Sequence, residues 1–465
     1  MLKRISANIG FLLQLTGLLV LLPIGIGFYF GETQELVPLF ISCVAFLGCG
    51  FLFNSLCERR DLDFKSSNVL FVVAFLILPL IGALPFIYAD PFGSTNFGDR
   101  ITNGIFESVS GFTTTGFSFV ANPEILPNSL LIYRSLIELM GGVGIVFLLL
   151  VFFQSKKSLE DFGHVIGVDN LSNIKRTFAS VLAIYSIFIV AFIAVFYFLG
   201  FRNLVQTSTL VIDTLTGGFQ PPSLVFQQYL SLVPKICLML LMLLGSVNFA
   251  FNYHLFKGKI TQAFSKEIIL YLAIIAFAAI AVSTLGRIGA LDSLFHVISM
   301  SSSTGQDYIG VSTQNSTVLS IFILLMLIGG CAFSMAGGIR ISRLLTLAKT
   351  VKQNITGLLV KEQGISQATS NAEEPNPEDN LALAAIILFA ATLFVFTIIF
   401  TTIGVSFTDA LFEVGSALTT NGISMGATTV AMPLAYKWLM IIAMTIGRIE
   451  IITIFIGLFP LGRKN

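Results

Sequence analysis

Four polar segments of this sequence share one order of residue types, a run rich in Ser and Thr that ends in glycine. They are Glu107–Gly116, Thr209–Gly218, His296–Gly305 and Glu413–Gly422. Hydroxyls and backbone carbonyls are the oxygen ligands that a dehydrated alkali cation needs. Glycine adopts positive φ at little cost, so it suits a position where successive carbonyls must turn to one side. Each segment alone is typical of an ordinary loop, but four in register predict one ring of cation ligands around an axis.

The residue nine positions before the final glycine is polar in all four segments: Glu107, Thr209, His296 and Glu413. A carboxylate at the end of an apolar helix is costly unless it is hydrogen-bonded. We therefore expect Glu107, His296 and Glu413 to support the loops by accepting hydrogen bonds from them. Direct ligation of an ion by these side chains is the alternative.

The composition indicates an integral membrane protein. Of 465 residues, 55% are hydrophobic and 11% are charged, and the mean hydropathy is +0.90, which lies far outside the range of soluble proteins. The net charge of +1 implies no nucleic-acid partner. The five cysteines lie in apolar surroundings without metal-ligand spacing, and we interpret them as small buried hydrophobes.

Ten apolar stretches are long enough to cross the hydrocarbon core, which takes about 20 residues. They lie near residues 9–31, 36–56, 68–90, 130–154, 178–200, 229–255, 265–287, 316–339, 381–404 and 434–458. Four shorter stretches end at the polar segments, near residues 101–113, 203–215, 291–302 and 408–419. They predict re-entrant half-helices, which are tolerated only where irregular backbone is buried or lines a wet cavity. The expected fold is an all-α polytopic membrane protein with ten transmembrane helices, four re-entrant pore half-helices and a fourfold pseudo-repeat around a central pore.

Lys and Arg are unequally distributed between the two sides of this arrangement. Nineteen lie on the side of the N-terminus. Six lie on the other side: Arg100, Arg134, Arg202, Lys235, Arg287 and Lys437. The positive-inside rule then predicts a multi-pass protein of the cell (plasma or inner) membrane with both termini in the cytoplasm. Mixed-charge segments at 154–177, 256–266 and 344–380 are expected on the cytoplasmic side, with residues 371–379 flexible.

The order of span, half-helix, polar loop and span recurs four times. We expect a helix pair outside the repeat at 1–66, followed by pore repeats at 67–177, 178–264, 265–380 and 381–465. The third repeat carries a glycine-rich interruption and a cytoplasmic linker. Half-helices that point their negative C-terminal ends at the axis favour a cation over an anion.

Several further motifs carry a family resemblance. They include Gly111–Gly116, Thr216–Phe219, Gly141–Ile145, Gly245–Phe249, Ile328–Ala332, Ala336–Arg340 and Gly447–Glu450. With these residues the chain resembles the TrkH/KtrB superfamily of potassium uptake proteins over nearly its whole length. The extra helix pair at the N-terminus is similar to the TrkH branch of that superfamily. The resemblance implies K⁺ as the transported ion, no bound organic cofactor, a homodimer, and a cytoplasmic nucleotide-binding (RCK-type) regulatory subunit as partner.

The resemblance also implies a selectivity filter. Carried over residue by residue, it consists of Thr114, Thr115, Gly116, Thr216, Gly217, Gly218, Ser303, Thr304, Gly305, Thr420, Asn421 and Gly422. One departure from the family pattern is Gln306-Asp307, directly after the third glycine. An anionic Asp307 at the mouth is expected to concentrate cations or to alter selectivity.

Glycines interrupt the eighth span at Gly329, Gly330, Gly337 and Gly338. Each weakens a helix by about 1 kcal/mol, so we expect an unwound stretch at membrane depth. The resemblance implies that this stretch is a gate below the filter, and close helix packing through small residues is the alternative. Arg448 lies inside the last span, where we expect a barrier to cations, with snorkelling to the interface as the alternative.

The alternative function is an ion-coupled (Na⁺ or H⁺) secondary transporter of K⁺ or another monovalent cation. Such proteins more often have inverted repeats around one midplane site, whereas four parallel repeats favour a pore. An enzyme is not expected, because the sequence has no His-Glu-x-x-His motif, no paired intramembrane Asp and no nucleophile elbow. An ATP-driven pump is also not expected, because there is no Gly-x-x-x-x-Gly-Lys-Ser/Thr loop.

Overall fold

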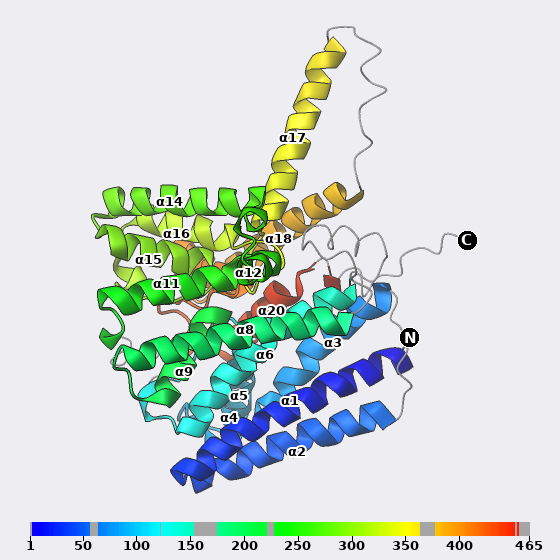
Figure 1. Ribbon diagram of the computed structural model, residues 1–465, viewed down its shortest axis with the longest axis vertical. Coiled ribbons are helices and arrows are strands. Elements are labelled where there is room, and N and C mark those ends of the chain that lie inside the picture. The colour runs from blue at the N-terminus through cyan, green and yellow to red at the C-terminus, as the bar shows by residue number, and fades with distance from the viewer. Residues whose placement is uncertain are drawn as a thin grey trace.

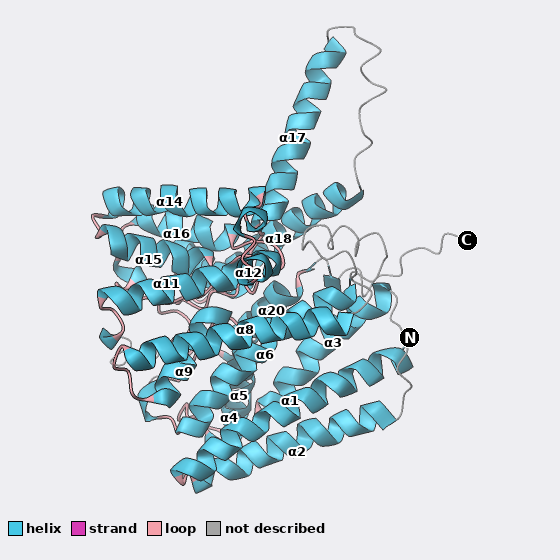
Figure 2. Cartoon of the chain, viewed as in Figure 1, coloured by secondary structure: helices cyan, strands magenta, loops and turns pink. Residues whose placement is uncertain are grey.

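The computed structural model describes residues 2–55, 64–120, 122–152, 174–220, 227–362, 377–451 and 453–454. Within these ranges the chain forms helices and loops without strands, as Figure 2 shows. Six described helices are long and apolar enough to cross a membrane, or seven if one bent pair counts as a single span. The prediction of an all-helical membrane protein is therefore confirmed.

The first two helices form a close pair at one edge of the molecule (Figure 1). They are α1 (Leu2–Phe30) and α2 (Thr33–Ser55). A Cβ atom added to Gly10 would lie 2.8 Å from the Gly50 carbonyl oxygen, and one added to Gly17 would lie 2.7 Å from Leu47. Small residues thus allow the two backbones to approach closely, as is common in membranes. The α1 helix also packs on α3 and α6.

Most of the remaining described helices form four sets in chain order, and each set contains a helix that ends at one of the polar segments. The first set is α3 (Phe64–Gly82) with α4 (Leu84–Ala89), α5 (Phe97–Phe112) and α6 (Asn128–Phe152). The second is α8 (Ile174–Phe198), α9 (Leu204–Thr216), and α11 (Leu232–Ser246) with α12 (Phe249–Phe256). The third is α14 (Lys266–Gly286), α15 (Ala290–Ser301) and α16 (Ser316–Ile328). The fourth is α18 (Pro377–Thr401), α19 (Phe407–Leu418) and α20 (Leu434–Ile449).

The short helices α5, α9, α15 and α19 occupy the stretches expected for half-helices. Side-chain caps begin three of them: Asn96, Asn203 and Ser406 each accept a hydrogen bond from the backbone amide three residues later. Their C-terminal halves are buried, polar residues included. Since buried polar groups need partners, α5, α9 and α19 are fixed at both ends, by a side-chain cap and by the loop that follows, whereas α15 begins at Gly289 without a side-chain cap.

Three of the expected spans are interrupted. The stretch at 229–255 is bent by 117° between α11 and α12, where Val247 is extended and the Asn248 side chain caps α12. The stretch at 316–339 stops being helical after Ile328, because Gly329 takes a φ of 70°. The stretch at 434–458 ends at Ile449, where Glu450 has a φ of 65°.

The glycine-rich interruption at 329–340 leads into α17 (Ile341–Glu362), which extends beyond the rest of the bundle (Figure 1). A short α13 (Ile260–Ala263) precedes α14, and single 3-10 turns lie at Pro123–Ile125 and Val311–Thr313. The predictions for residues 154–173 and 371–376, and for 455–458 at the end of the last span, lie outside the described residues.

Candidate functional site

The four polar loops meet in a closed ring at the C-terminal ends of α5, α9, α15 and α19. We call them loop 1 (113–120), loop 2 (217–220), loop 3 (302–310) and loop 4 (419–427). Their backbones are in contact in chain order. A Cβ atom added to Gly116 would overlap the Gly218 carbonyl, Gly217 would meet Ser303, Gly305 would meet Asn421, and Gly422 would meet Thr115. Loop 1 thus touches loop 2, loop 2 touches loop 3, loop 3 touches loop 4, and loop 4 closes on loop 1.

Loops 1, 3 and 4 turn in the same way. The residue two before each glycine has positive φ, with values of 53° at Thr114, 57° at Ser303 and 53° at Thr420. The residue after it donates its amide to a carbonyl five residues earlier, as Thr115 does to Ser110 over 2.8 Å. The glycines that end these turns also have positive φ. This helix C-terminal motif is known for satisfying the last carbonyls of a helix.

Loop 2 is built differently from the other three. Its positive φ of 73° falls on Gly217, which caps α9 directly, and not on Gly218. When the four segments are aligned on their final glycine, loop 2 therefore matches the other loops in sequence but not in backbone conformation. Loop 2 is tied to loop 3 by Gln220, whose side-chain amide donates to the Gly305 carbonyl over 2.7 Å. The side-chain amide of Gln306 in loop 3 donates to the Thr214 hydroxyl of α9 over 2.6 Å.

Buried hydroxyl oxygens lie beside the ring. Thr114 Oγ1 and Thr420 Oγ1, at equivalent positions in loops 1 and 4, have no hydrogen-bond partner among the described residues. The equivalent Ser303 Oγ of loop 3 accepts a hydrogen bond from the Gly337 amide over 3.1 Å. Such unpartnered oxygens are costly in a protein interior.

Glu107 and Glu413 hold loops 1 and 4 through the same pair of positions. Glu107 accepts from the hydroxyl of Ser118, eleven residues later, over 2.9 Å and from the amide of Phe119 over 3.1 Å. Glu413 accepts from the hydroxyl of Ser424, again eleven residues later, over 2.6 Å and from the next amide over 2.8 Å. Both glutamates are fully buried. Each side chain reaches from its short helix to the chain leaving the ring.

Loop 3 makes the same connection with different chemistry. His296 lies where the glutamates lie, and the residue eleven positions later is Asp307, at 3.3 Å from His296 Nε2. The amide of Tyr308 also lies 3.3 Å from this nitrogen. Asp307 accepts from the amides of Ile309, Gly310 and Val311, and its side chain is 15% exposed. The carboxylate is thus engaged with its own loop and with His296.

Two buried charged residues of α6 were missed by sequence reasoning. Arg134, which we had assigned to the outer surface, is 3% exposed and ion-paired with Glu107 over 2.8 Å. Its guanidinium also lies 3.9 Å from the centre of the Phe219 ring in loop 2. Glu138 accepts the Phe219 amide and is fully buried. An ionisable residue within an apolar span is the signal that would have pointed to both.

Thr209, the loop 2 counterpart of the glutamates, does not reach the departing chain. Its hydroxyl donates to the Gln206 carbonyl within α9. Two further residues assigned to the outer surface are also buried: Lys235, which pairs with Asp292 over 2.7 Å, and Lys437, which donates to Asn103 over 2.8 Å. These cations satisfy the outer parts of the short helices.

The glycine-rich loop, residues 329–340, lies directly against loops 3 and 4. Besides the bond from Gly337 to Ser303, a Cβ atom on Gly337 would overlap the Thr419 carbonyl. The same loop is fixed on the α11–α12 bend, where the Cys331 amide donates to the Ser246 carbonyl over 2.9 Å. The Ala332 amide donates to Glu267 of α14 over 2.7 Å. These backbone amides of the irregular segment are therefore satisfied by protein groups, as irregular backbone within a membrane requires.

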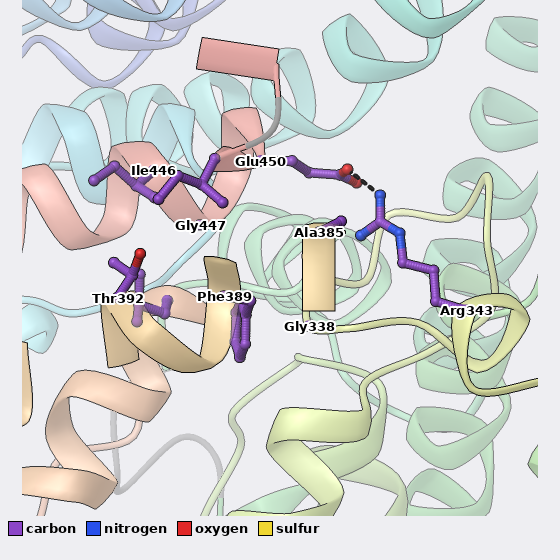
Figure 3. A pocket seen from close by; sticks show the side chains of 10 residues that line it. Gly338, Arg343, Ala385, Phe389, Thr392, Ile446, Gly447 and Glu450 are labelled. Carbon is purple, nitrogen blue, oxygen red and sulfur yellow. Dashed lines mark hydrogen bonds and ion pairs between the residues drawn. The ribbon is translucent and has the colours of Figure 1, made fainter. Parts of the chain in front are cut away.

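Arg448 connects the glycine-rich loop with the first repeat. It is 3% exposed, and it donates to the Met335 carbonyl over 2.7 Å and to the Gly141 carbonyl over 3.1 Å. Its neighbour Glu450 forms separate ion pairs with Arg340, over 2.9 Å, and with Arg343. Figure 3 shows the Glu450 carboxylate pointing at the Arg343 guanidinium beside a small pocket that α18, α20 and the glycine-rich loop line.

Comparison with known proteins finds a family match over part of the chain and relatives over most of its length. A family profile described as "TrkH: Cation transport protein" matches residues 273–460. The chain is 27% identical over 458 residues to an uncharacterized cation transporter of Methanocaldococcus jannaschii, covering 96% of this chain and 93% of that protein. It is 24% identical to the Trk system potassium uptake protein TrkH of Escherichia coli K12, with 87% of each chain covered.

A solved structure supports the same fold. The potassium transporter TrkH from Vibrio parahaemolyticus superposes with a TM-score of 0.83 at 21% identity, over 98% of both chains. That likeness extends over all four helix sets. This chain is a multi-pass membrane protein that shares its fold with a solved TrkH structure and matches the TrkH cation transport family model over residues 273–460.

Proposed function

We propose that this protein takes up K⁺ through the ring of four loops. The observation that carries the proposal is the cyclic contact of the four loop backbones, each with a glycine against a carbonyl of the next. A ring of carbonyls supplies ligands of modest field strength, which suit a dehydrated monovalent cation. Relatives named as Trk potassium uptake proteins support K⁺ as the ion.

In this proposal the selectivity filter consists of the three residues that end each loop motif. They are Thr114, Thr115, Gly116, Thr216, Gly217, Gly218, Ser303, Thr304, Gly305, Thr420, Asn421 and Gly422. Glu107, His296 and Glu413 act as supports that hold the chain leaving the ring, because their hydrogen bonds go to the loops. The short helices direct their C-terminal dipoles at the ring, which favours cations.

We further propose that the glycine-rich loop, with Gly329, Gly330, Gly337 and Gly338, is the gate. Two observations support this role. The glycine-rich loop contacts loops 3 and 4, and Arg448 donates a hydrogen bond to the Met335 carbonyl of the same loop. A buried guanidinium beside this loop repels a cation that leaves the ring. In this proposal the glycine-rich loop and Arg448 both lie on the path of the ion, so closing the pore requires no additional element.

The assembly we propose follows the resemblance. It is a homodimer in the plasma or inner membrane with both termini in the cytoplasm, and its partner is a nucleotide-binding subunit of the RCK type. The protruding α17 and the cytoplasmic linkers are suitable docking elements for such a subunit. The pore repeats are expected at 67–177, 178–264, 265–380 and 381–465, after the helix pair at 1–66.

The test is ⁸⁶Rb⁺ uptake into proteoliposomes of the purified protein, with external K⁺, Na⁺ or choline as competitors. Block by K⁺ at much lower concentration than by Na⁺ is the expected result. Equal block by K⁺ and Na⁺ would contradict a K⁺-selective filter. Uptake that depends strictly on an imposed Na⁺ or H⁺ gradient would favour a coupled transporter.

A further inference from the structure

We propose that the long helix α14 holds the glycine-rich loop in place, with Glu267 and Tyr271 as its positioning residues. This inference deepens the proposed function and rests on it, because it concerns how the proposed gate is held. The two residues are four positions apart in α14, so their side chains lie on the same face of that helix. Glu267 contacts the glycine-rich loop itself, and Tyr271 contacts the α11–α12 bend on which the loop lies.

The glycine-rich loop and the α11–α12 bend are joined through their backbones. Three hydrogen bonds of 2.9 to 3.0 Å connect them, from the amides of Cys331, Met335 and Phe249 to the carbonyls of Ser246, Gly245 and Phe333, respectively. A Cβ atom added to Gly330 would lie 2.8 Å from the Ser246 carbonyl oxygen, so the two backbones are also in close contact. A group that fixes the bend therefore also fixes the loop.

Glu267 holds the glycine-rich loop from the side of α14. Its carboxylate accepts the hydrogen bond of the Ala332 amide over 2.7 Å. The other hydrogen bonds that described amides of this loop donate go to carbonyl or hydroxyl oxygens, and a bond to a charged acceptor is roughly twice as strong. Glu267 lies in the first turn of α14, where the helix dipole favours a carboxylate. The charge is thus stabilised at the place from which it reaches the loop.

Tyr271 connects the bend with the ring. Its side chain is 1% exposed, and its hydroxyl donates to Ser246 Oγ over 3.0 Å and lies 3.2 Å from Ser301 Oγ. Ser246 is the residue whose carbonyl accepts the Cys331 amide. Ser301 ends α15, directly before loop 3. One hydroxyl therefore links the support of the proposed gate to one quadrant of the proposed filter.

The α14 helix is suited to act as the fixed element among its neighbours. It is helical without interruption from Lys266 to Gly286, whereas α11 ends at the bend and α16 ends at Gly329. It packs on α15 and α16 (Figure 1). When Glu267 or Tyr271 loses its contact, the loop is held by its remaining, neutral bonds, so it leaves its place more often.

The first test uses the native thiol of Cys331, which is fully buried and lies next to Ala332. N-ethylmaleimide reacts with this thiol in the purified full-length protein when the loop opens, and peptide mass spectrometry distinguishes it from the other cysteines. We expect Glu267→Ala to raise the labelling rate about tenfold, as for a lost hydrogen bond to a charged group. Glu267→Gln keeps an acceptor oxygen, so we expect a rate within about twofold of the wild type.

The matched control is Glu35→Ala, because Glu35 is also a glutamate in the first turn of a long helix, α2. Equal labelling of Cys331 in Glu267→Ala and Glu35→Ala would overturn the role of Glu267, as would equal labelling in Glu267→Ala and Glu267→Gln. Glu267→Asp keeps the charge at the start of α14 and withdraws the carboxylate by one methylene, so it tests the contact even if Glu267→Ala does not fold. We expect it to label faster than the wild type, and a wild-type rate would count against the contact.

Tyr271→Phe removes only the hydroxyl. We expect labelling of Cys331 to rise about threefold, because a neutral hydrogen bond to the bend is lost. The control is Tyr229→Phe, which removes a buried hydroxyl that is bonded to Thr207. The same labelling rate in these two variants would overturn the role of Tyr271.

The initial rate of ⁸⁶Rb⁺ uptake separates this inference from the proposed function. We expect uptake to rise in Glu267→Ala and, by a smaller factor, in Tyr271→Phe, in the same order as the labelling of Cys331. Faster labelling without faster uptake would support the role of α14 in holding the loop and would contradict the proposed gate. A wild type that takes up no ⁸⁶Rb⁺ would contradict the proposed function, and the labelling result would remain valid.

Discussion

The Gly337 amide donates a hydrogen bond to Ser303 Oγ over 3.1 Å, so the glycine-rich loop is tied to the ring by a residue of the ring itself. Ser303 has a φ of 57° and is buried, and Gly337 also lies against the Thr419 carbonyl. The tie therefore joins the proposed filter and the proposed gate through one side chain, that of Ser303. We expect a change in one to affect the other through this contact.

Replacing Ser303 by Ala tests this tie. The variant removes the acceptor of the Gly337 amide, which contributes about 1 kcal/mol as a net hydrogen bond. We expect the initial rate of ⁸⁶Rb⁺ uptake to rise by about fivefold, because the blocking position of the loop is less favoured. The control is Ser208→Ala, whose hydroxyl bonds only within its own helix. A rate at or below that of the wild type would show that the bond does not hold a gate closed.

The substitution Gly116→Ser tests the ring. Gly116 has a φ of 84°, and a Cβ atom there would overlap the Gly218 carbonyl. We expect a loss of K⁺ over Na⁺ discrimination by about tenfold or more, since both the turn and the contact with loop 2 must shift. Size-exclusion chromatography checks that the variant remains folded.

The matched control for this substitution is Gly426→Ser. Gly426 also has positive φ, 101°, but no atom lies within 4 Å of a Cβ added there. It therefore reports the cost of the backbone conformation alone. If the two variants lost discrimination equally, the contact between loops 1 and 2 would have no role in selectivity.

Substitution of Arg448 tests the barrier. In Arg448→Ala both carbonyl contacts, to Met335 and Gly141, are lost together with the buried charge. We expect uptake to rise on the order of tenfold, because the electrostatic barrier is removed. Arg448→Lys keeps a charge without the forked geometry, and we expect an intermediate rate. The control is Arg202→Ala, an exposed arginine beside Tyr197. If Arg448→Ala took up ⁸⁶Rb⁺ at the same rate as this control, Arg448 would have a structural role and would not be a barrier.

Asp307 gives a prediction about acid stability. Although burial raises its pKa, hydrogen bonds from His296 and from the Val311 amide outweigh burial and bring the pKa of Asp307 below its ordinary value. A lowered folded-state pKa contributes stability above the unfolded value, near 4, and this stability is lost as the pH falls through the folded value. We expect Asp307→Asn to lower the melting temperature at neutral pH and to approach the wild type in acid.

The same variant tests whether Asp307 attracts cations at the mouth. Its carboxylate is bonded to three amides and to His296, so we expect Asp307→Asn to change the dependence of ⁸⁶Rb⁺ uptake on ionic strength by less than about twofold. A large loss of uptake at low salt only would support an electrostatic role at the mouth. Thermal unfolding in detergent at several pH values measures the stability effect separately.

Much of the architecture could be predicted from the sequence because it depends on local properties. The apolar lengths place the short helices within a few residues of α5, α9, α15 and α19, and glycine pairs break the helix before Ile341 as their propensity requires. The polar residue nine positions before each glycine is likewise a local pattern, since a short helix and its loop fix the reach of that side chain.

The parts that were missed depend on partners distant in sequence. Arg134 is a buried ion-pair partner because Glu107 lies opposite it. Its position within an apolar span indicates a buried charge but does not identify the partner, which lies 27 residues away in sequence. The 117° bend between α11 and α12 depends on the glycine-rich loop, which donates hydrogen bonds to Gly245 and Ser246. Loop 2 was aligned on Gly218, although its backbone turns at Gly217, because adjacent glycines are equivalent in sequence and only the packing distinguishes them.

The closure of the ring by four loops of one chain has a consequence for how it can vary. In a ring of four identical subunits every substitution is present four times, so a group that suits one position must suit all of them. Here each loop can diverge alone. The contact of His296 with Asp307 at loop 3 and that of Glu138 with the Phe219 amide at loop 2 differ from the contacts of the glutamates at loops 1 and 4. The ring is therefore asymmetric in charge and in hydrogen bonding, and an ion on its axis meets four chemically different walls.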